Sequence, residues 1–376
     1  MGGKLSTVAR GFTIVKEFSS LCRRIGLNRK VTNQWGPGMN EQNRNDLDRF
    51  DLPVIDLHSD LLTDVVLRRQ GGERRVLATR HLTGLLAGGV SAVVAAIWVE
   101  WAGDAANAWR LARRYVEALT SEIIETPGLQ LVRSPEELEA ARCAGRLGII
   151  LAAEGLGFLN GDPEQLDGWH ALGLRVASLT WNGSNPFACG QGVGAGGVTK
   201  LGRVALQRMA DLGLVLDVSH LSDEAFWHAI DGFPGVVIAS HSNARALCDH
   251  PRNLTDDQIQ ALTRRGGLIG LNAYPPFVDV HAPSLERYLD HAAYLAEKFG
   301  VEYVAFGFDF TGYLPSTAAD AVGGPGQMRS LPGLAGPEDV PNLLEGLRRR
   351  GFVEKEIRAL AWDNWLRVWG QSRPAR

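Results

Sequence analysis

Cysteine is scarce in this sequence, and positive charge is not in excess. Only four of the 376 residues are cysteine (Cys22, Cys143, Cys189 and Cys248), and no two of them form a Cys-x-x-Cys pair. This spacing excludes a zinc ribbon and does not suit a disulfide framework, so we expect ordinary thiols in a reducing, cytoplasmic compartment. The formal net charge of −3 argues against nucleic acid as the main partner and leaves a small molecule as the expected one.

A long hydrophobic run is also lacking. The longest uncharged stretch, residues 82–99, is interrupted by Gly88 and Gly89. A short buried helix, a loop and a β-branched strand suit this pattern better than a membrane span, so we expect no transmembrane segment.

The N-terminal segment is basic and has no apolar core. Its first 30 residues carry seven Lys or Arg and one acid, which does not fit a secretory signal. We expect residues 1–50 to be a flexible or loosely docked extension and residues 51–376 to form a single domain. Attachment to a membrane through a basic helix is the alternative, since Met1-Gly2-x-x-x-Ser6 fits a myristoylation pattern.

Eight short apolar runs alternate with helical patterns along the rest of the chain. We expect strands at residues 54–60, 91–99, 147–153, 174–180, 214–219, 236–240, 268–272 and 303–308. Most are too apolar to have a solvated face, as is typical of parallel strands covered on both sides. Eight strands that alternate with helices favour an α/β fold of the (β/α)8 TIM-like barrel type. An open doubly wound sheet is less favoured, because no G-x-G-x-x-G follows an early strand.

Polar residues stand at the ends of several of these strands. They are His58 and Asp60 (first strand), Glu154 (third), His220 (fifth), His241 (sixth) and Asp309 (eighth). Each alone fits a solvated or helix-capping residue equally well. In this barrel type, however, strand ends meet at one rim, where active sites form. The remaining six histidines, His250 among them, are expected to be surface or packing residues.

The residue types at this rim point to metal chemistry. Histidine and carboxylate ligands suit zinc. Six potential ligands exceed what one tetrahedral ion uses, so two ions bridged by a carboxylate such as Glu154 are more plausible than one. Paired ions activate a shared water and polarise a carbonyl, which indicates hydrolysis.

Short motifs in a fixed order resemble the membrane (renal) dipeptidases of peptidase family M19. They are Asp56-Leu57-His58-Ser59-Asp60, Glu154-Gly155, Leu179-Thr180-Trp181-Asn182, Asp217-Val218-Ser219-His220, Ser240-His241-Ser242, Arg252-Asn253, Gly307-Phe308-Asp309-Phe310 and Asn364-Trp365-Leu366-Arg367-Val368. The resemblance covers residues 54–369. It implies a (β/α)8 metallo-dipeptidase in which two Zn²⁺ ions and a metal-bound hydroxide hydrolyse dipeptides, including L-Xaa-D-Xaa.

The resemblance also implies roles for individual residues. His58 and Asp60 match ligands of one zinc, Glu154 matches the bridge, and His220 and His241 match ligands of the other zinc. Asp309 matches a catalytic acid that passes a proton from the water to the leaving amine. Arg252 matches the residue that binds the substrate carboxylate, a task for which a guanidinium is well shaped. Trp181, Asn272 and Tyr274 complete the expected substrate-binding set.

Trp181 departs from the family pattern, which has a histidine that contacts the scissile group. An indole donates one hydrogen bond but cannot carry a proton. Two alternatives to dipeptide hydrolysis therefore stay open: a metal-dependent hydrolase of an unusual amide or secondary-metabolite intermediate, and a barrel that binds a small molecule without turnover. Another divalent ion in place of zinc, and a homodimer, are likewise left open.

Overall fold

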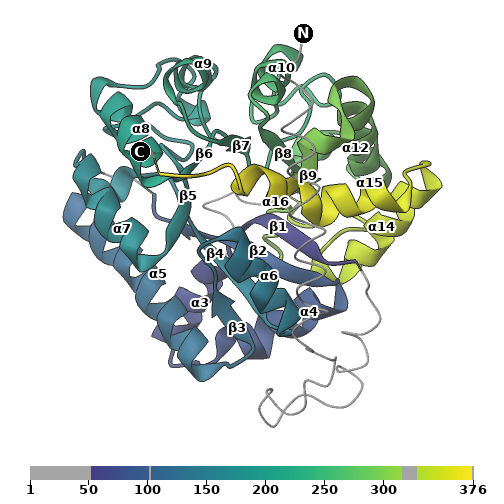
Figure 1. Cartoon of the computed structure of the whole chain (residues 1–376), viewed down its shortest axis with the longest axis horizontal. Coiled ribbons are helices and arrows are strands. Elements are labelled where there is room, and N and C mark those ends of the chain that lie inside the picture. The colour runs from purple at the N-terminus through teal and green to yellow at the C-terminus, as the bar shows by residue number, and fades with distance from the viewer. Residues whose placement is uncertain (1–51, 101–102, 316–327, 375–376) are drawn as a thin grey trace.

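The computed structural model describes residues 52–100, 103–315 and 328–374, and in them parallel strands alternate with helices (Figure 1). The strands are β1 (Val54–Ser59), β2 (Val90–Trp98), β3 (Leu129–Leu131), β4 (Leu147–Glu154), β5 (Leu174–Ser178), β6 (Val215–Asp217), β7 (Val237–Ala239), β8 (Leu268–Leu271) and β9 (Val304–Phe306). The α-helices are α3 (Leu61–Gln70), α4 (Leu82–Ala87), α5 (Ala105–Glu125), α6 (Pro135–Cys143), α7 (Leu166–Leu172), α8 (Lys200–Leu212), α9 (Asp223–Gly232), α10 (Asp256–Arg264), α11 (Pro275–Val278), α12 (Leu285–Phe299), α14 (Val340–Arg349), α15 (Glu354–Arg358) and α16 (Asn364–Trp369).

Eight of the strands form a nearly closed parallel barrel. Their order is β1-β2-β4-β5-β6-β7-β8-β9, and β3 pairs with β4 outside this path. All eight expected strands are present, so the predicted barrel is confirmed. The short strand β3 was not expected, because three residues of Leu-Gln-Leu carry too little pattern to distinguish them from a loop. The expected extension at residues 1–50 lies outside the described residues.

The side chain of Asp56 joins the first strand to the last. Its Oδ1 accepts a hydrogen bond from the backbone N–H of His58 at 3.2 Å and another from that of Phe308, just after β9, at 2.8 Å. The backbone N–H of Asp309 also donates to the carbonyl of His58 at 3.2 Å. We call this junction of β1 with the segment after β9 the seam. It brings the ends of β1 and β9 together.

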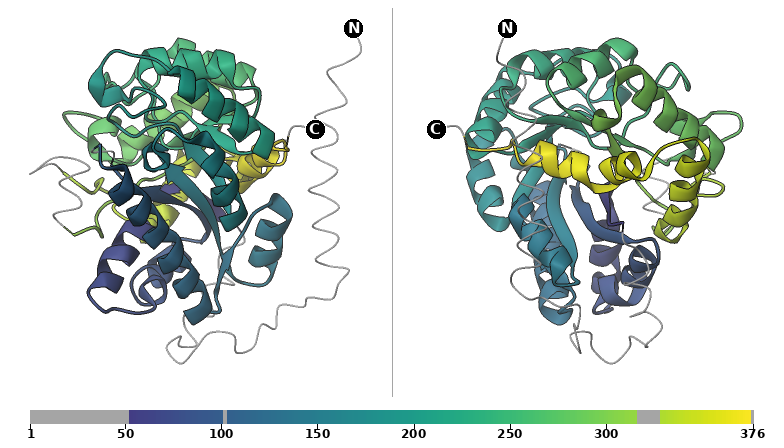
Figure 2. Two further views of the ribbon diagram at one scale, coloured as in Figure 1. Left: turned by 90° about the vertical axis from the view of Figure 1, so that its left-hand side faces the viewer. Right: turned by 45° about the vertical axis from the view of Figure 1, so that its right-hand side comes forward.

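Buried apolar side chains form two clusters. The larger one packs the helices against the strands. The smaller one joins alternate strand residues such as Ile150 and Ala152 to three tryptophans of the C-terminal segment, Trp362, Trp365 and Trp369. Figures 1 and 2 show this segment crossing the barrel beside β8 and β9. Because alternate side chains share a face of a strand, Glu154 points the same way as Ile150 and Ala152.

The uncharged run from Leu82 to Val99 forms α4, a Gly88-Gly89 turn and β2, as expected. No helix in the described ranges has the length and apolar character needed to cross a membrane. A capping box of Thr255 and Gln258 starts α10. Ser134 caps α6, but Glu137 accepts from the backbone of Arg133 rather than from that of Ser134.

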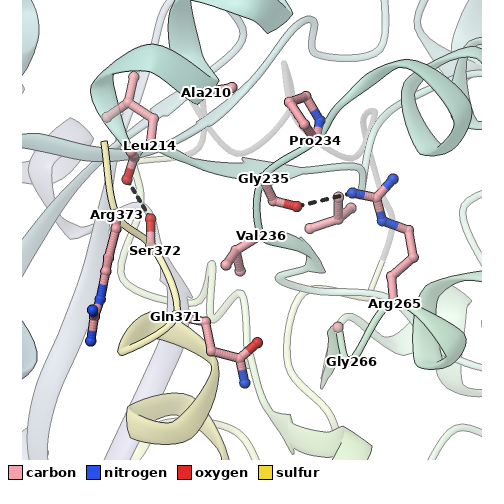
Figure 3. A pocket seen from close by; sticks show the side chains of 13 residues that line it. Ala210, Leu214, Pro234, Gly235, Val236, Arg265, Gly266, Gln371, Ser372 and Arg373 are labelled. Carbon is pink, nitrogen blue, oxygen red and sulfur yellow. Dashed lines mark hydrogen bonds between the residues drawn. The ribbon is translucent and has the colours of Figure 1, made fainter. Parts of the chain in front are cut away.

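A cavity of about 330 Å³ lies at the amino ends of β6, β7 and β8 (Figure 3). It is lined by the loops before these strands and by the C-terminal residues 371–373. Arg265 donates to the carbonyls of Ile230, Phe233 and Gly235, the last at 3.0 Å. Ser372 donates to the carbonyl of Gly213. Backbone carbonyls thus take up the polar groups at this end of the barrel.

Candidate metal centre

Carboxylate and imidazole groups converge where the strands end. One ligand atom from each of His58, Glu154 and His241 lies within 4.8 Å of the others, and the same holds for His58, Asp60 and Asp309. Oε1 of Glu154 lies 2.8 Å from Nε2 of His220 and 3.5 Å from Nε2 of His58. The structure therefore brings together all six strand-end residues.

The sequence predicts that the first strand includes Asp60, but the strand is one residue shorter. Strand β1 ends at Ser59, and Asp60 occupies the N-cap position of α3 with φ −84° and ψ 15°. Strand alternation therefore does not orient its side chain. The turn from β1 into α3 places the carboxylate beside His58 instead.

Burial shifts the pKa of each cluster member in favour of its neutral form. It lowers the pKa of His58 to about 3 and those of His220 and His241 well below the usual range. It raises the pKa of Asp60 to about 8 and that of Asp309 to about 6. The pKa of Glu154 is well above its usual range, first through burial and then through the charges of Asp60 and Asp309. These three buried carboxyl groups can be ionised together only if a cation compensates their charge.

Hydrogen bonds fix the ring orientation of His220. Its Nδ1 lies 2.9 Å from the side-chain oxygen of Asn182, an acceptor. The ring proton therefore sits on Nδ1, which leaves the lone pair of Nε2 directed at Glu154. Such outer partners orient metal-binding histidines in general. Asn182 was part of a recognised motif, but the sequence assigned it no role.

A serine and an aspartate orient His241 in the same way. The hydroxyl of Ser240 donates to Oδ2 of Asp217 at 2.5 Å and lies 2.7 Å from Nδ1 of His241. Because its proton points to Asp217, the hydroxyl accepts from Nδ1 and leaves Nε2 without a proton. Oδ1 of Asp217 accepts from Ser219 and from the backbone of Ser240. This role was missed too. Its signal was a buried acid in the apolar strand that precedes a candidate ligand.

Asp309 is held in an unusual backbone conformation. Its φ of 57° is in the left-handed region, which residues other than glycine rarely adopt. The side-chain amide of Asn272 donates to its Oδ2 at 3.1 Å, and its Oδ1 lies 4.0 Å from Nε2 of His58. Asn272 in turn accepts from the backbone N–H of Tyr274 at 2.5 Å. Hydrogen bonds thus link Asn272 and Tyr274, two of the expected substrate-binding residues, to Asp309, the expected catalytic acid.

Arg252 reaches the cluster from the loop after β7. Its Nη2 lies 3.2 Å from Nε2 of His220, and its guanidinium lies over the ring of Phe277 at 5.4 Å. The backbone N–H of Arg252 donates to Nδ1 of His250, two residues earlier in the same loop, so this ring helps to fix the backbone of the loop. Burial lowers the pKa of Arg252 to about 10.

Trp181 lies beside the cluster. Its ring centroid is 6.0 Å from that of His220 and 5.2 Å from that of Trp98, the last residue of β2. Each of the expected site residues is thus next to the metal-ligand candidates or linked to them.

The residues present fit a bound metal. Four buried polar atoms of the candidate ligands and Arg252 have no hydrogen-bond partner within the described part of the chain: Nε2 of His58, Oδ1 of Asp60, Oε2 of Glu154 and Nη1 of Arg252. Buried polar atoms are almost always partnered, so orphaned ones call for an explanation. Three of the four belong to ligand types that suit zinc, and the neutral histidines are in the state that binds it.

Comparisons with known proteins agree with this chemistry. The family model for membrane dipeptidase (peptidase family M19) matches residues 43–376. The uncharacterized protein in the pqqA 5′ region of Klebsiella pneumoniae is 32% identical over 256 residues, which make up 64% of this chain and 88% of that protein. Dipeptidase aclJ of Aspergillus oryzae is 31% identical over 232 residues, 60% of this chain and 52% of that protein.

A solved structure has the same fold. The metallo peptidase from Rhodobacter sphaeroides, liganded with a phosphinate mimic of the dipeptide L-Ala-D-Ala, superposes with a TM-score of 0.76. The match covers 86% of this chain and 99% of that one, at 24% sequence identity.

Proposed function

The chain belongs to the membrane dipeptidase family, peptidase family M19, and on that premise we propose that it uses two Zn²⁺ ions to hydrolyse a dipeptide, L-Xaa-D-Xaa dipeptides included. The observation that carries this proposal is the set of orphaned buried atoms of His58, Asp60 and Glu154 beside two histidines, His220 and His241, whose Nε2 atoms lie 2.8 Å and 3.8 Å from Oε1 of Glu154. Two bound Zn²⁺ ions supply activation of a shared water and polarisation of the amide carbonyl.

The ligand set divides into two halves around one carboxylate. His58 and Asp60 would hold one ion, His220 and His241 would hold the other, and Glu154 would be the ligand shared between them. Asn182 and Ser240 keep the two histidines in the tautomer that binds metal.

Asp309 moves the proton. Asn272 holds one carboxylate oxygen, while the other faces His58 across 4.0 Å. That second oxygen takes a proton from the attacking water and delivers it to the leaving amine, as general acid–base catalysis requires.

Arg252 selects substrates with a free C-terminus. Its unpartnered Nη1 and its Nη2 form a buried fork beside the cluster. A carboxylate binds such a fork through two parallel hydrogen bonds, which fixes both position and direction.

Metal analysis and a panel of dipeptides test the proposal together. We expect about two zinc ions per chain by elemental analysis and hydrolysis of at least some L-Xaa-D-Xaa dipeptides. Reconstitution with Mn²⁺ or Co²⁺ in place of Zn²⁺ identifies the ion that supports turnover. Fully metal-loaded protein that cleaves no dipeptide of the panel would remove the peptidase assignment.

A second candidate function is hydrolysis of a less common amide, and the indole of Trp181 at 6.0 Å from His220 favours it. The Trp181→His variant separates the two functions. If this variant gains dipeptidase activity that the parent lacks, the natural substrate is not an ordinary dipeptide.

A further inference from the structure

Two tryptophans form one edge of the metal centre. Trp98 and Trp181 meet edge to face at 5.2 Å, with 71° between their planes, and Trp181 is tilted by 38° from His220. Both indoles are half-buried. This arrangement is the favourable one for an aromatic pair, so each ring stabilises the position of the other. We call Trp98 and Trp181 the indole wall.

Two glycines hold the backbone of Trp181. A Cβ added to Gly155, which has a φ of +97°, would lie 3.0 Å from the backbone N of Trp181. A Cβ added to Gly190 would lie 2.0 Å from the carbonyl oxygen of Trp181. Larger residues at either position would displace this segment. Close packing against both glycines therefore fixes the backbone of Trp181.

The indole wall and Arg252 lie on different sectors of the barrel. Trp98 ends β2 and Trp181 follows β5, so they flank β4 with its Glu154. Arg252 comes from the loop after β7. In the nearly closed ring of eight strands β4 and β7 are three positions apart, and Arg252 and Trp181 both approach His220. An amide whose carboxylate is bound by Arg252 and whose scissile bond lies at the ligand cluster can therefore reach the indole wall with its acyl end.

The chemistry of the indole wall restricts what can bind there. The two indoles present flat apolar area and N–H donors, and no acceptor or charge. Nε1 of Trp98 is buried and has no partner among the described residues. An anionic side chain placed here would lose its hydration and gain no ion-pair partner from the wall. A flat ring matches both the area and the edge-to-face geometry.

We infer that the indole wall is an acyl-side specificity site that selects dipeptides with an aromatic residue before the scissile bond. This inference rests on the proposed function, since it names the substrate class of the same centre. It assigns specificity to two residues that hold neither the metal nor the substrate carboxylate.

Matched substrates test the inference. We expect kcat/KM for L-Phe-D-Ala to exceed that for L-Ala-D-Ala by about tenfold or more, because an aromatic contact and added apolar burial both favour the larger side chain. In Trp181→Ala the ratio should fall to within about twofold of one, and Trp181→Phe should retain most of the preference. Metal content should be unchanged in both variants. Trp227→Ala is the control, because Trp227 is an exposed indole on α9 outside the wall.

Binding of inert analogues separates the inference from the proposed function. Phosphinate mimics of L-Phe-D-Ala and L-Ala-D-Ala are titrated calorimetrically into the metal-loaded wild type and Trp181→Ala. Tighter binding of the aromatic mimic to wild type alone supports the wall, even if no dipeptide is cleaved and the proposed function fails. Equal affinities, a preference that survives in Trp181→Ala, or no binding of either mimic would overturn the inference.

Discussion

Arg252 and Arg265 lie at opposite ends of the same barrel, and burial lowers the pKa of both. They differ in how their donors are used. Arg265, at the amino end, donates to the carbonyl of Ile230 in α9 and to those of Phe233 and Gly235 in the loop after it. Arg252, at the carboxyl end, has a buried Nη1 without a partner in the described structure and an Nη2 beside His220. The guanidinium of Arg265 is bound by backbone carbonyls, whereas that of Arg252 has a buried donor without a partner among the described residues.

This contrast separates a structural cavity from a functional centre. A buried donor without a partner costs free energy, so a fold keeps one where a ligand completes it. At the carboxyl end the candidate ligands and Arg252 have four such atoms in one place, whereas backbone carbonyls bind the arginine at the amino-end cavity. We therefore expect substitutions at the carboxyl end to change catalysis with little loss of stability, and those at the amino end to do the reverse.

The largest effect is expected for Glu154→Gln. Loss of the bridging carboxylate should lower kcat/KM by at least about 10³-fold, because both metal positions depend on it. The metal-free variant should unfold at the same temperature as the metal-free parent or a higher one, since burial disfavours the ionised carboxylate. Kinetics and elemental analysis measure the loss of activity and of metal, and thermal melts measure the stability of the metal-free protein. If the metal-free variant melted at a lower temperature than the metal-free parent, the expected contrast between the two ends of the barrel would be wrong.

Arg252→Gln should have the next largest effect. We expect kcat/KM to fall by about 10²-fold, mainly through KM, because the charge-assisted pair with the substrate carboxylate is lost. The melting temperature should hardly change, since Nη1 has no protein partner to lose among the described residues. Arg265→Gln is the matched control and should leave KM unaltered.

Asp217→Asn sharpens the contrast within the carboxyl end itself. Asp217 is not a candidate metal ligand, but it orients Ser240 and, through Ser240, the candidate ligand His241. We expect zinc affinity, measured against a competing chelator, to fall by about 10- to 100-fold. Asp223→Asn is the control, because Asp223 pairs with Arg245 and Gln258 outside the cluster. Unchanged affinity in Asp217→Asn would mean that His241 is oriented by packing alone.

The smallest effect is expected for Arg265→Gln in stability. Loss of its bonds to backbone carbonyls should lower the free energy of unfolding by about 1–2 kcal/mol, a modest value because the side chain is partly exposed. Denaturant titration measures this change. Activity per metal-loaded chain should equal that of the parent.

Strand ends were predictable from the sequence because apolar runs of parallel strands stop abruptly at polar residues. That signal identified His58, Glu154, His220 and His241 before any contact was known. Arg252 was different. It stands 13 positions beyond Ala239, the last residue of β7, so its place depends on a loop whose path no periodicity encodes. Only the family resemblance singled it out.

The supporting partners were beyond sequence reasoning for another reason. Asn182 and Asp217 act through hydrogen bonds to side chains that follow other strands, and Ser240 passes the effect of Asp217 on to its neighbour His241. The direction of these bonds depends on strand register. In isolation each resembles a turn or capping residue. The conformation of Asp309, with its positive φ, was equally invisible, because it arises from how the seam closes around His58.

The seam between β1 and β9 would couple metal binding to closure of the barrel. An ion held by His58 and Asp60, with Asp309 beside them, would cross-link the end of the first barrel strand to the segment after the last one. We therefore expect the metal-free protein to open first along the seam, and faster amide hydrogen exchange in β1 would then report the loss of metal.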